Sequence, residues 1–169
     1  ALLDQGQGPD WLRNPQVAKL IADAMRFFDG QRYEWLAYCI MPNHVHVVLT
    51  PLLKIAGSYY SLAAIMHSIK GFTARRANQL MGRSGAFWLH ESYDHCVRDE
   101  AELHRIITYV ANNPVKAGLV AEWQAWPWTY VREIQAGGLC YSMCCKPLAC
   151  RNEPAAPGLA AVPGRTSVA

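Results

Sequence analysis

Apolar positions along the chain follow two periods, which separate the expected helices from the expected strands. Apolar residues recur at helical spacing over residues 15–29, 61–80 and about 99–113. Runs of aromatic and aliphatic residues predict strands over residues 33–40, 44–50 and 87–97. The expected order is therefore helix, strand, strand, helix, strand, helix.

Residues at the helix ends support these boundaries. Asn14 is a suitable N-cap, and Pro15 fits the first helical position because it needs no backbone donor there. Asp99 has Glu102 three residues later, which is the spacing of a capping box. Pro114 disfavours the helical conformation of the residue before it, so we expect the third helix to end there.

This order predicts an α+β fold. Hairpins that alternate with crossover helices favour an antiparallel sheet with helices on one face, in a ferredoxin-like split βαβ arrangement that lacks its opening strand. We expect residues 1–135 to form this domain. Residues 136–169 are rich in Cys, Pro and Ala without periodicity, which predicts a disordered tail.

Composition narrows the function classes only slightly. The 169 residues are 51% apolar and carry a formal net charge of +3, so a polyanionic partner is only weakly indicated. No stretch is apolar enough to span a membrane, and residues 1–6 do not resemble a signal peptide. We therefore expect a cytoplasmic protein, and a monomer rather than a dimer.

The six cysteines fall into two groups. Cys39 and Cys96 lie in apolar runs and are expected to be reduced core thiols. The other four are in the tail, and their spacing matches no C-x-x-C zinc motif. A metal- or RNA-binding module built from these cysteines stays an alternative.

The strand over 44–50 carries two histidines. Strand side chains alternate between faces, so His44 and His46 share one face while Val45 and Val47 share the other. Two imidazoles so placed can hold one metal ion together. The alternative is a partly buried strand with two hydrogen-bonded histidines.

The third helix carries two further groups with chemistry. Tyr109 and Asn113 are four residues apart, so they share a helix face on the flank of the buried stripe. Imidazole nitrogen and amide oxygen suit a divalent ion that keeps open positions for phosphate oxygens. A phenol suits a nucleophile that attacks phosphorus.

Three sequence blocks resemble the single-tyrosine HUH transposases, and among them the REP-associated tyrosine transposases. The first is Met41-Pro42-Asn43-His44-Val45-His46, with the histidine–hydrophobic–histidine motif. The second is Phe87-Trp88-Leu89-His90-Glu91-Ser92-Tyr93-Asp94-His95, and the third runs from Tyr109-Val110-Ala111-Asn112-Asn113 to Leu119. The resemblance covers about residues 10–130.

The resemblance implies a metal-dependent endonuclease and strand transferase that acts on single-stranded hairpin DNA. It also implies association with the bacterial nucleoid. It makes His44 and His46 ligands of Mg²⁺ or Mn²⁺, with Asn113 as the third ligand. Tyr109 becomes the nucleophile that forms a covalent 5′-phosphotyrosine intermediate. The candidates for phosphate contacts are Lys70, Arg75, Arg76 and Lys116.

Two alternatives remain within this family. Tyr93 could be taken for the nucleophile, but no amide follows it at helical spacing. A non-catalytic DNA-binding regulator, or a decaying remnant of the same fold, is favoured by the absence of the family's opening strand beside the 44–50 strand. If another segment fills that position, the tail is the first candidate.

Overall fold

The computed structural model describes residues 9–89, 94–133 and 167–168. The helices are α1 (Pro15–Arg26), α2 (Leu62–Leu80), α3 (Glu100–Ala111) and α4 (Asn113–Lys116), with 3₁₀ turns η2 (Trp11–Arg13) and η3 (Trp123–Ala125). The strands are β1 (Tyr33–Ile40), β2 (Val45–Pro51), β3 (His95–Cys96), β4 (Thr129–Val131) and β5 (Ser167–Val168).

The five strands form one antiparallel sheet in the order β3-β5-β2-β1-β4. The β1–β2 hairpin is its longest pairing, with Ile40 opposite Val45 at the turn. The register shifts between Trp35 and Ala37, so a bulge interrupts β1. The α+β class and the antiparallel sheet are thus confirmed.

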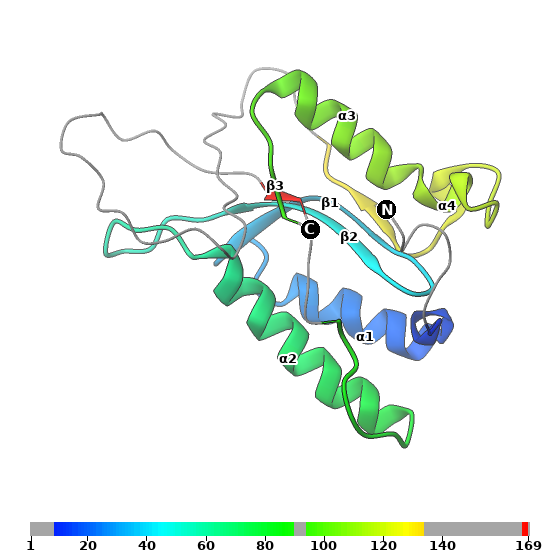
Figure 1. Cartoon of the computed structure of the whole chain (residues 1–169). Helices are drawn as coiled ribbons and strands as arrows, with labels where there is room; N and C mark the ends of the chain where they lie inside the picture. The colour runs from blue at the N-terminus through cyan, green and yellow to red at the C-terminus, as the bar shows by residue number, and fades with distance from the viewer. Residues whose placement is uncertain (1–8, 90–93, 134–166, 169) are drawn as a thin grey trace.

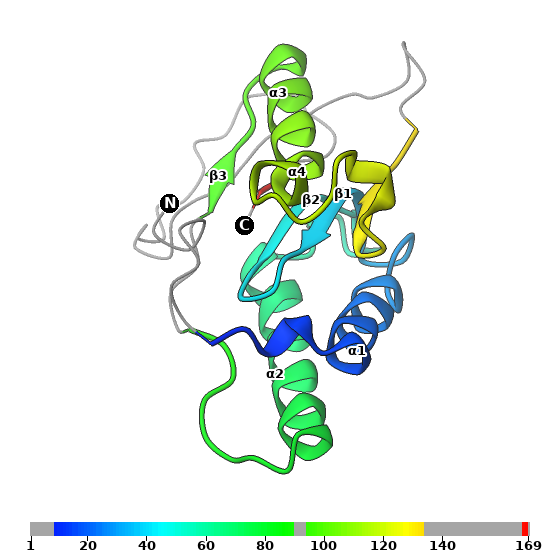
Figure 2. The same cartoon turned by 90° about the vertical axis from the view of Figure 1, so that its right-hand side faces the viewer.

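Helices cover both faces of this sheet, which corrects the expectation of helices on one face. Figures 1 and 2 show α1 and α2 on one side and α3 on the other. Trp35 and Leu49 belong to the core beneath α1 and α2, whereas Leu36 and Val48 pack with Leu103 of α3 in a second core. Nearly every residue of β1 is buried, which requires a layer on each side of the strand.

The predicted helix starts are confirmed. The Asn14 side chain accepts a hydrogen bond from the Gln16 amide at 2.9 Å, and Asp99 Oδ1 accepts one from the Glu102 amide at 2.7 Å. Both contacts satisfy amides that have no partner inside the helix.

The apolar spacing over residues 61–80 predicts that Phe72 and Leu80 lie on the buried face of α2, which is wrong at the C-terminal end of the helix. Phe72 and Leu80 are 51% and 52% exposed, and Thr73 and Ala77 are buried instead. Helical spacing considers apolar positions only, so it assigns the large apolar side chains to the buried face. Thr73 becomes compatible with burial because its hydroxyl donates to the Ile69 carbonyl oxygen at 2.7 Å.

Within the described part of the expected strand over 87–97, only the two residues of β3 are in a strand. Residues 90–93 lie outside the described part of the chain. Phe87 is buried against Trp11 with ring centroids 5.3 Å apart, and Trp88 Nε1 donates to Thr73 Oγ1 at 2.9 Å. These residues therefore pack against η2 and α2 instead of extending the sheet.

The position expected to be empty beside the histidine strand is filled by β5. Val168 pairs with Val48 of β2 and with His95 of β3, and Ser167 pairs with Leu49 and Cys96. A segment of the expected tail thus bridges β2 and β3. The rest of residues 136–169 lies outside the described part of the chain.

Proline at both β5 positions is expected to lower the free energy of unfolding by about 1–3 kcal/mol, because β5 pairs on both sides and proline cannot donate to either neighbour. Thermal unfolding of the S167P/V168P double variant would measure the loss. The control is V168T, which keeps the backbone donor. Equal melting temperatures for all three proteins would show that the bridge adds no stability.

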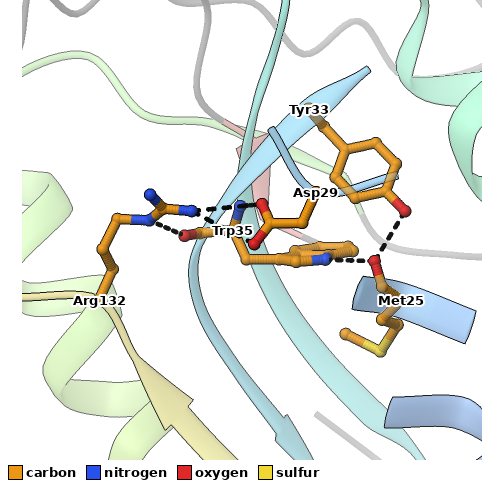
Figure 3. A network of polar contacts seen from close by, with 5 residues as sticks. All are labelled: Met25, Asp29, Tyr33, Trp35 and Arg132. Carbon is orange, nitrogen blue, oxygen red and sulfur yellow. Dashed lines mark hydrogen bonds and ion pairs between the residues drawn. The ribbon is translucent and has the colours of Figure 1, made fainter. Parts of the chain in front are cut away.

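A polar network joins α1, β1 and the residue that follows β4 (Figure 3). The Met25 carbonyl oxygen accepts hydrogen bonds from Tyr33 Oη at 2.8 Å and from Trp35 Nε1 at 2.7 Å. Arg132 Nε donates to the Trp35 carbonyl oxygen at 2.7 Å, and its guanidinium pairs with Asp29 at 3.2 Å. Burial raises the pKa of Tyr33 to about 12, so this phenol stays protonated in the core.

Candidate active site

His44 directly precedes β2 and His46 is its second residue, and both lie on the face that α3 covers. Val45 and Val47 pack with the α1–α2 core, whereas Val48 packs with the α3 core. His46 lies on the same face as Val48, and its ring centroid is 5.7 Å from that of Tyr109 on α3. The strand alternation therefore places the imidazoles as the sequence predicts.

The two imidazole rings point their Nε2 atoms toward each other. His44 Nε2 and His46 Nε2 are 2.9 Å apart, and the rings are nearly perpendicular at 89°. Two nitrogen ligands at about 2.1 Å from a metal, at right angles, would be about 3 Å apart. His44 is buried at 8% exposure, so its orientation is fixed by packing. The spacing fits a shared divalent ion.

Asn43 selects the tautomer of His44. His44 Nδ1 lies 2.7 Å from Asn43 Oδ1. A carboxamide oxygen only accepts, so Nδ1 carries the proton and Nε2 of the neutral ring presents its lone pair toward His46. From sequence alone, Asn43 is a residue of the turn between the 33–40 and 44–50 strands. Its signal was its position directly before the first histidine, where a side-chain acceptor can reach the ring.

Replacing Asn43 by Leu is expected to reduce metal affinity by about 10- to 100-fold, the range for groups that orient a metal ligand. The buried His44 ring would lose the acceptor that holds its tautomer. Titration of Mn²⁺ by calorimetry measures the effect, and Asn43→Asp, which keeps an acceptor oxygen, serves as the control. Equal affinity of the Leu variant and the unaltered protein would contradict this orienting role.

Helix α3 positions the Tyr109 side chain next to the imidazole pair. The Asp99 cap starts the helix, and Leu103 anchors it in the second core. The Tyr109 side chain is 39% exposed, so a ligand can reach it. Lys116 Nζ of α4 lies 4.2 Å from the centroid of the Tyr109 ring, which brings a positive charge to the phenol.

Asn113 is buried behind Tyr109. Its exposure is 5%, and its Nδ2 donates to the Tyr109 carbonyl oxygen at 3.0 Å. This bond uses the amide's donor end and leaves the oxygen as the end that could bind a metal. Within the described structure, no hydrogen bond joins the Asn113 side chain to either imidazole. Among the residues that the structure describes, no three His, Cys, Asp or Glu side chains gather at a possible metal site, so a third ligand from this part of the chain would have to be of another type.

The expected phosphate contacts fall into two groups. Lys116 lies beside Tyr109, whereas Lys70, Arg75 and Arg76 belong to α2, across the sheet. Burial lowers the pKa of Lys70, and the nearby Asp94 partly offsets this shift. Lys70 is only partly exposed, so it is less accessible to DNA than a fully exposed cation. Arg75 and Arg76 are exposed, and their contact with DNA stays a prediction.

The cysteines do not add a second site to the described structure. Cys39 is fully buried, and burial raises the pKa of its thiol to about 11, so it is a protonated core residue as expected. The four tail cysteines and Tyr93 lie outside the described residues.

The chain is similar to known proteins over the region that carries this site. The family model of IS200-like transposases matches residues 13–113. A Haemophilus influenzae protein provisionally named a REP-associated tyrosine transposase is 26% identical over 112 residues, and the match spans 62% of each chain. The match thus spans less than two thirds of that relative's length.

A solved structure has the same fold. It is a REP-associated tyrosine transposase bound to a REP hairpin, with a TM-score of 0.55 and 20% sequence identity. The alignment covers 73% of this chain and 68% of the other chain. In the part of this chain that the structure describes, no helix is long and apolar enough to cross a membrane.

Proposed function

Because this chain belongs to the family of IS200-like transposases, we propose that it cleaves and rejoins single-stranded hairpin DNA through a covalent phosphotyrosine. The observation that carries the proposal is the placement of Tyr109 against the converging imidazoles of His44 and His46. The resemblance of the fold to a transposase solved with a REP hairpin supports hairpin DNA as the substrate.

Tyr109 is the nucleophile in this proposal. Its phenolic oxygen attacks the scissile phosphorus, and the bond from phosphorus to the 3′ oxygen breaks. The 3′ oxygen takes up a proton and leaves as a 3′ hydroxyl, while the 5′ phosphate stays on Tyr109. Attack by a 3′ hydroxyl reverses the step and joins two strands without an external energy source.

The side chains around Tyr109 support its reactivity. A free tyrosine phenol has a pKa of about 10, so it is mostly protonated at neutral pH. The Lys116 ammonium, 4.2 Å from the ring centroid, favours the negative charge of the phenolate. The exposed flank of Tyr109 gives the DNA strand access to the oxygen.

His44 and His46 would hold a Mg²⁺ or Mn²⁺ ion, with the Asn113 carboxamide oxygen as the proposed third ligand. The 2.9 Å spacing of the two Nε2 atoms fits this role. When bound, the ion supplies Lewis-acid polarisation and orientation of a phosphate oxygen. Asn43 keeps the His44 lone pair on the side that faces His46.

A non-catalytic DNA-binding regulator is the second candidate. It is favoured by Asn113, whose side-chain amide donates to the Tyr109 carbonyl oxygen and, in the described structure, makes no hydrogen bond to an imidazole. Incubation of 5′-labelled hairpin DNA with the protein and Mn²⁺ separates the two functions. Shorter labelled products ending in a 3′ hydroxyl support the transposase, whereas binding without any product supports the regulator.

A further inference from the structure

The outer surface of α3 and α4 has an open hollow next to Tyr109. Tyr109 itself forms part of its wall. The lining residues are His104, Arg105, Thr108, Tyr109, Asn112, Val115 and Lys116. The imidazole pair is not among them, so this α3–α4 hollow and the histidines adjoin different parts of Tyr109.

The lining of the hollow suits an anion. Arg105 and Lys116 are exposed cations, His104 can donate a hydrogen bond, and no carboxylate lines the hollow. Among the described residues, neither Arg105 nor Lys116 has a carboxylate within 4.0 Å. The nearby Glu102 is occupied instead by His95 at 2.9 Å and by the Arg98 amide. The positive charge of the hollow is therefore available to a ligand.

The hollow also has a suitable position relative to the nucleophile. Arg105 precedes Tyr109 by one helical turn, about 6 Å along the axis. A phosphate bound to Arg105 would thus lie about one nucleotide step away from a phosphate attacked by Tyr109. Lys116 lines the hollow and also contacts the Tyr109 ring, so its charge is shared by the hollow and the nucleophile.

We propose that the α3–α4 hollow binds a backbone phosphate of the DNA next to the scissile phosphate, with Arg105 as its main contact. The guanidinium offers paired donors to phosphate oxygens. His104 adds a donor at the rim, and Lys116 adds charge. The hollow then holds the strand in line with Tyr109, so Arg105 is a positioning residue for the cleavage. This inference rests on the proposed function of Tyr109.

The test measures binding, so that it does not depend on cleavage. The full chain with Tyr109→Phe is mixed with hairpin oligonucleotides that each carry one neutral methylphosphonate linkage, moved one step at a time past the expected cleavage position. The same series is measured with Tyr109→Phe/Arg105→Gln. The control is Tyr109→Phe/Lys19→Gln, since Lys19 pairs with Asp23 on α1, across the sheet.

One neutral linkage adjacent to the scissile position is expected to weaken binding by about tenfold when Arg105 is present, as for loss of a charge-assisted contact. With Arg105→Gln, affinity for the normal DNA falls by a similar factor and that linkage has no further effect. Arg105→Lys restores part of the affinity. The Lys19→Gln control keeps the full response to the neutral linkage.

Two results would overturn the inference. One is that the loss of affinity caused by Arg105→Gln and the loss caused by each neutral linkage multiply when the two changes are combined. That result would show that Arg105 contacts none of these phosphates. The other is that Arg105→Gln leaves affinity unchanged. Failure of the proposed function has a different signature, because the unaltered protein would form no covalent product whatever the state of the hollow.

Discussion

Tyr109→Phe is expected to lower the rate of hairpin cleavage on the order of 10⁴-fold or more, the scale on which enzymes lose activity when a nucleophile is removed. The substitution removes one oxygen and leaves the ring that contacts His46 and Lys116. Because the side chain is 39% exposed, we expect the free energy of unfolding to change by no more than about 0.5 kcal/mol. Single-turnover cleavage of labelled hairpin DNA measures the rate.

Tyr93→Phe is the matched comparison, since Tyr93 is the other tyrosine in the family's sequence blocks. It should cleave at the rate of the unaltered protein. Binding of the uncut hairpin by Tyr109→Phe should stay within a few-fold of normal, which separates loss of chemistry from loss of DNA affinity. Activity that survives in Tyr109→Phe and disappears in Tyr93→Phe would move the nucleophile to Tyr93.

Loss of either imidazole is expected to have the second largest effect. His44→Ala or His46→Ala should slow metal-dependent cleavage by about 10³-fold, because Lewis-acid assistance contributes several kcal/mol to such reactions. The two Nε2 atoms meet at 2.9 Å, so neither ring can replace the other. Cleavage as a function of Mn²⁺ concentration measures the loss, and EDTA should abolish cleavage by the unaltered protein.

The control for the imidazoles is His67→Ala, on the exposed surface of α2. It should keep the activity and the Mn²⁺ dependence of the unaltered protein. His44 is buried, so thermal unfolding must show that His44→Ala is folded at the assay temperature. Asn113→Ala should weaken the Mn²⁺ dependence less, because an amide oxygen is a weaker ligand than imidazole. Full activity of folded His44→Ala in EDTA would contradict the metal-binding role.

Local rules predicted the parts of the structure that depend on neighbouring residues. The alternation of strand side chains placed both histidines on one face, and the caps at Asn14 and Asp99 fixed two helix starts. The sequence also contains a signal for the second helical layer. Residues 33–40 are apolar at nearly every position, which indicates a strand covered on both faces.

The remaining features depend on contacts between distant segments. β5 has two residues in a stretch without periodicity, and only its pairing with Val48 and His95 makes it a strand. The contact of Lys116 with Tyr109 depends on how α4 turns back after α3, which spacing does not specify. Asn43 could be read from sequence as a turn residue, but its role toward His44 needs the 2.7 Å contact.

The most direct test of the central claim is to trap the covalent intermediate of the unaltered protein on hairpin DNA and to identify the modified residue by mass spectrometry. Trypsin separates the two candidates, because Tyr109 falls in the peptide 106–116 and Tyr93 in the peptide 84–98. We predict a nucleotide attached through its 5′ phosphate to Tyr109. Cleavage without any adduct, or an adduct on the peptide 84–98, would contradict the account.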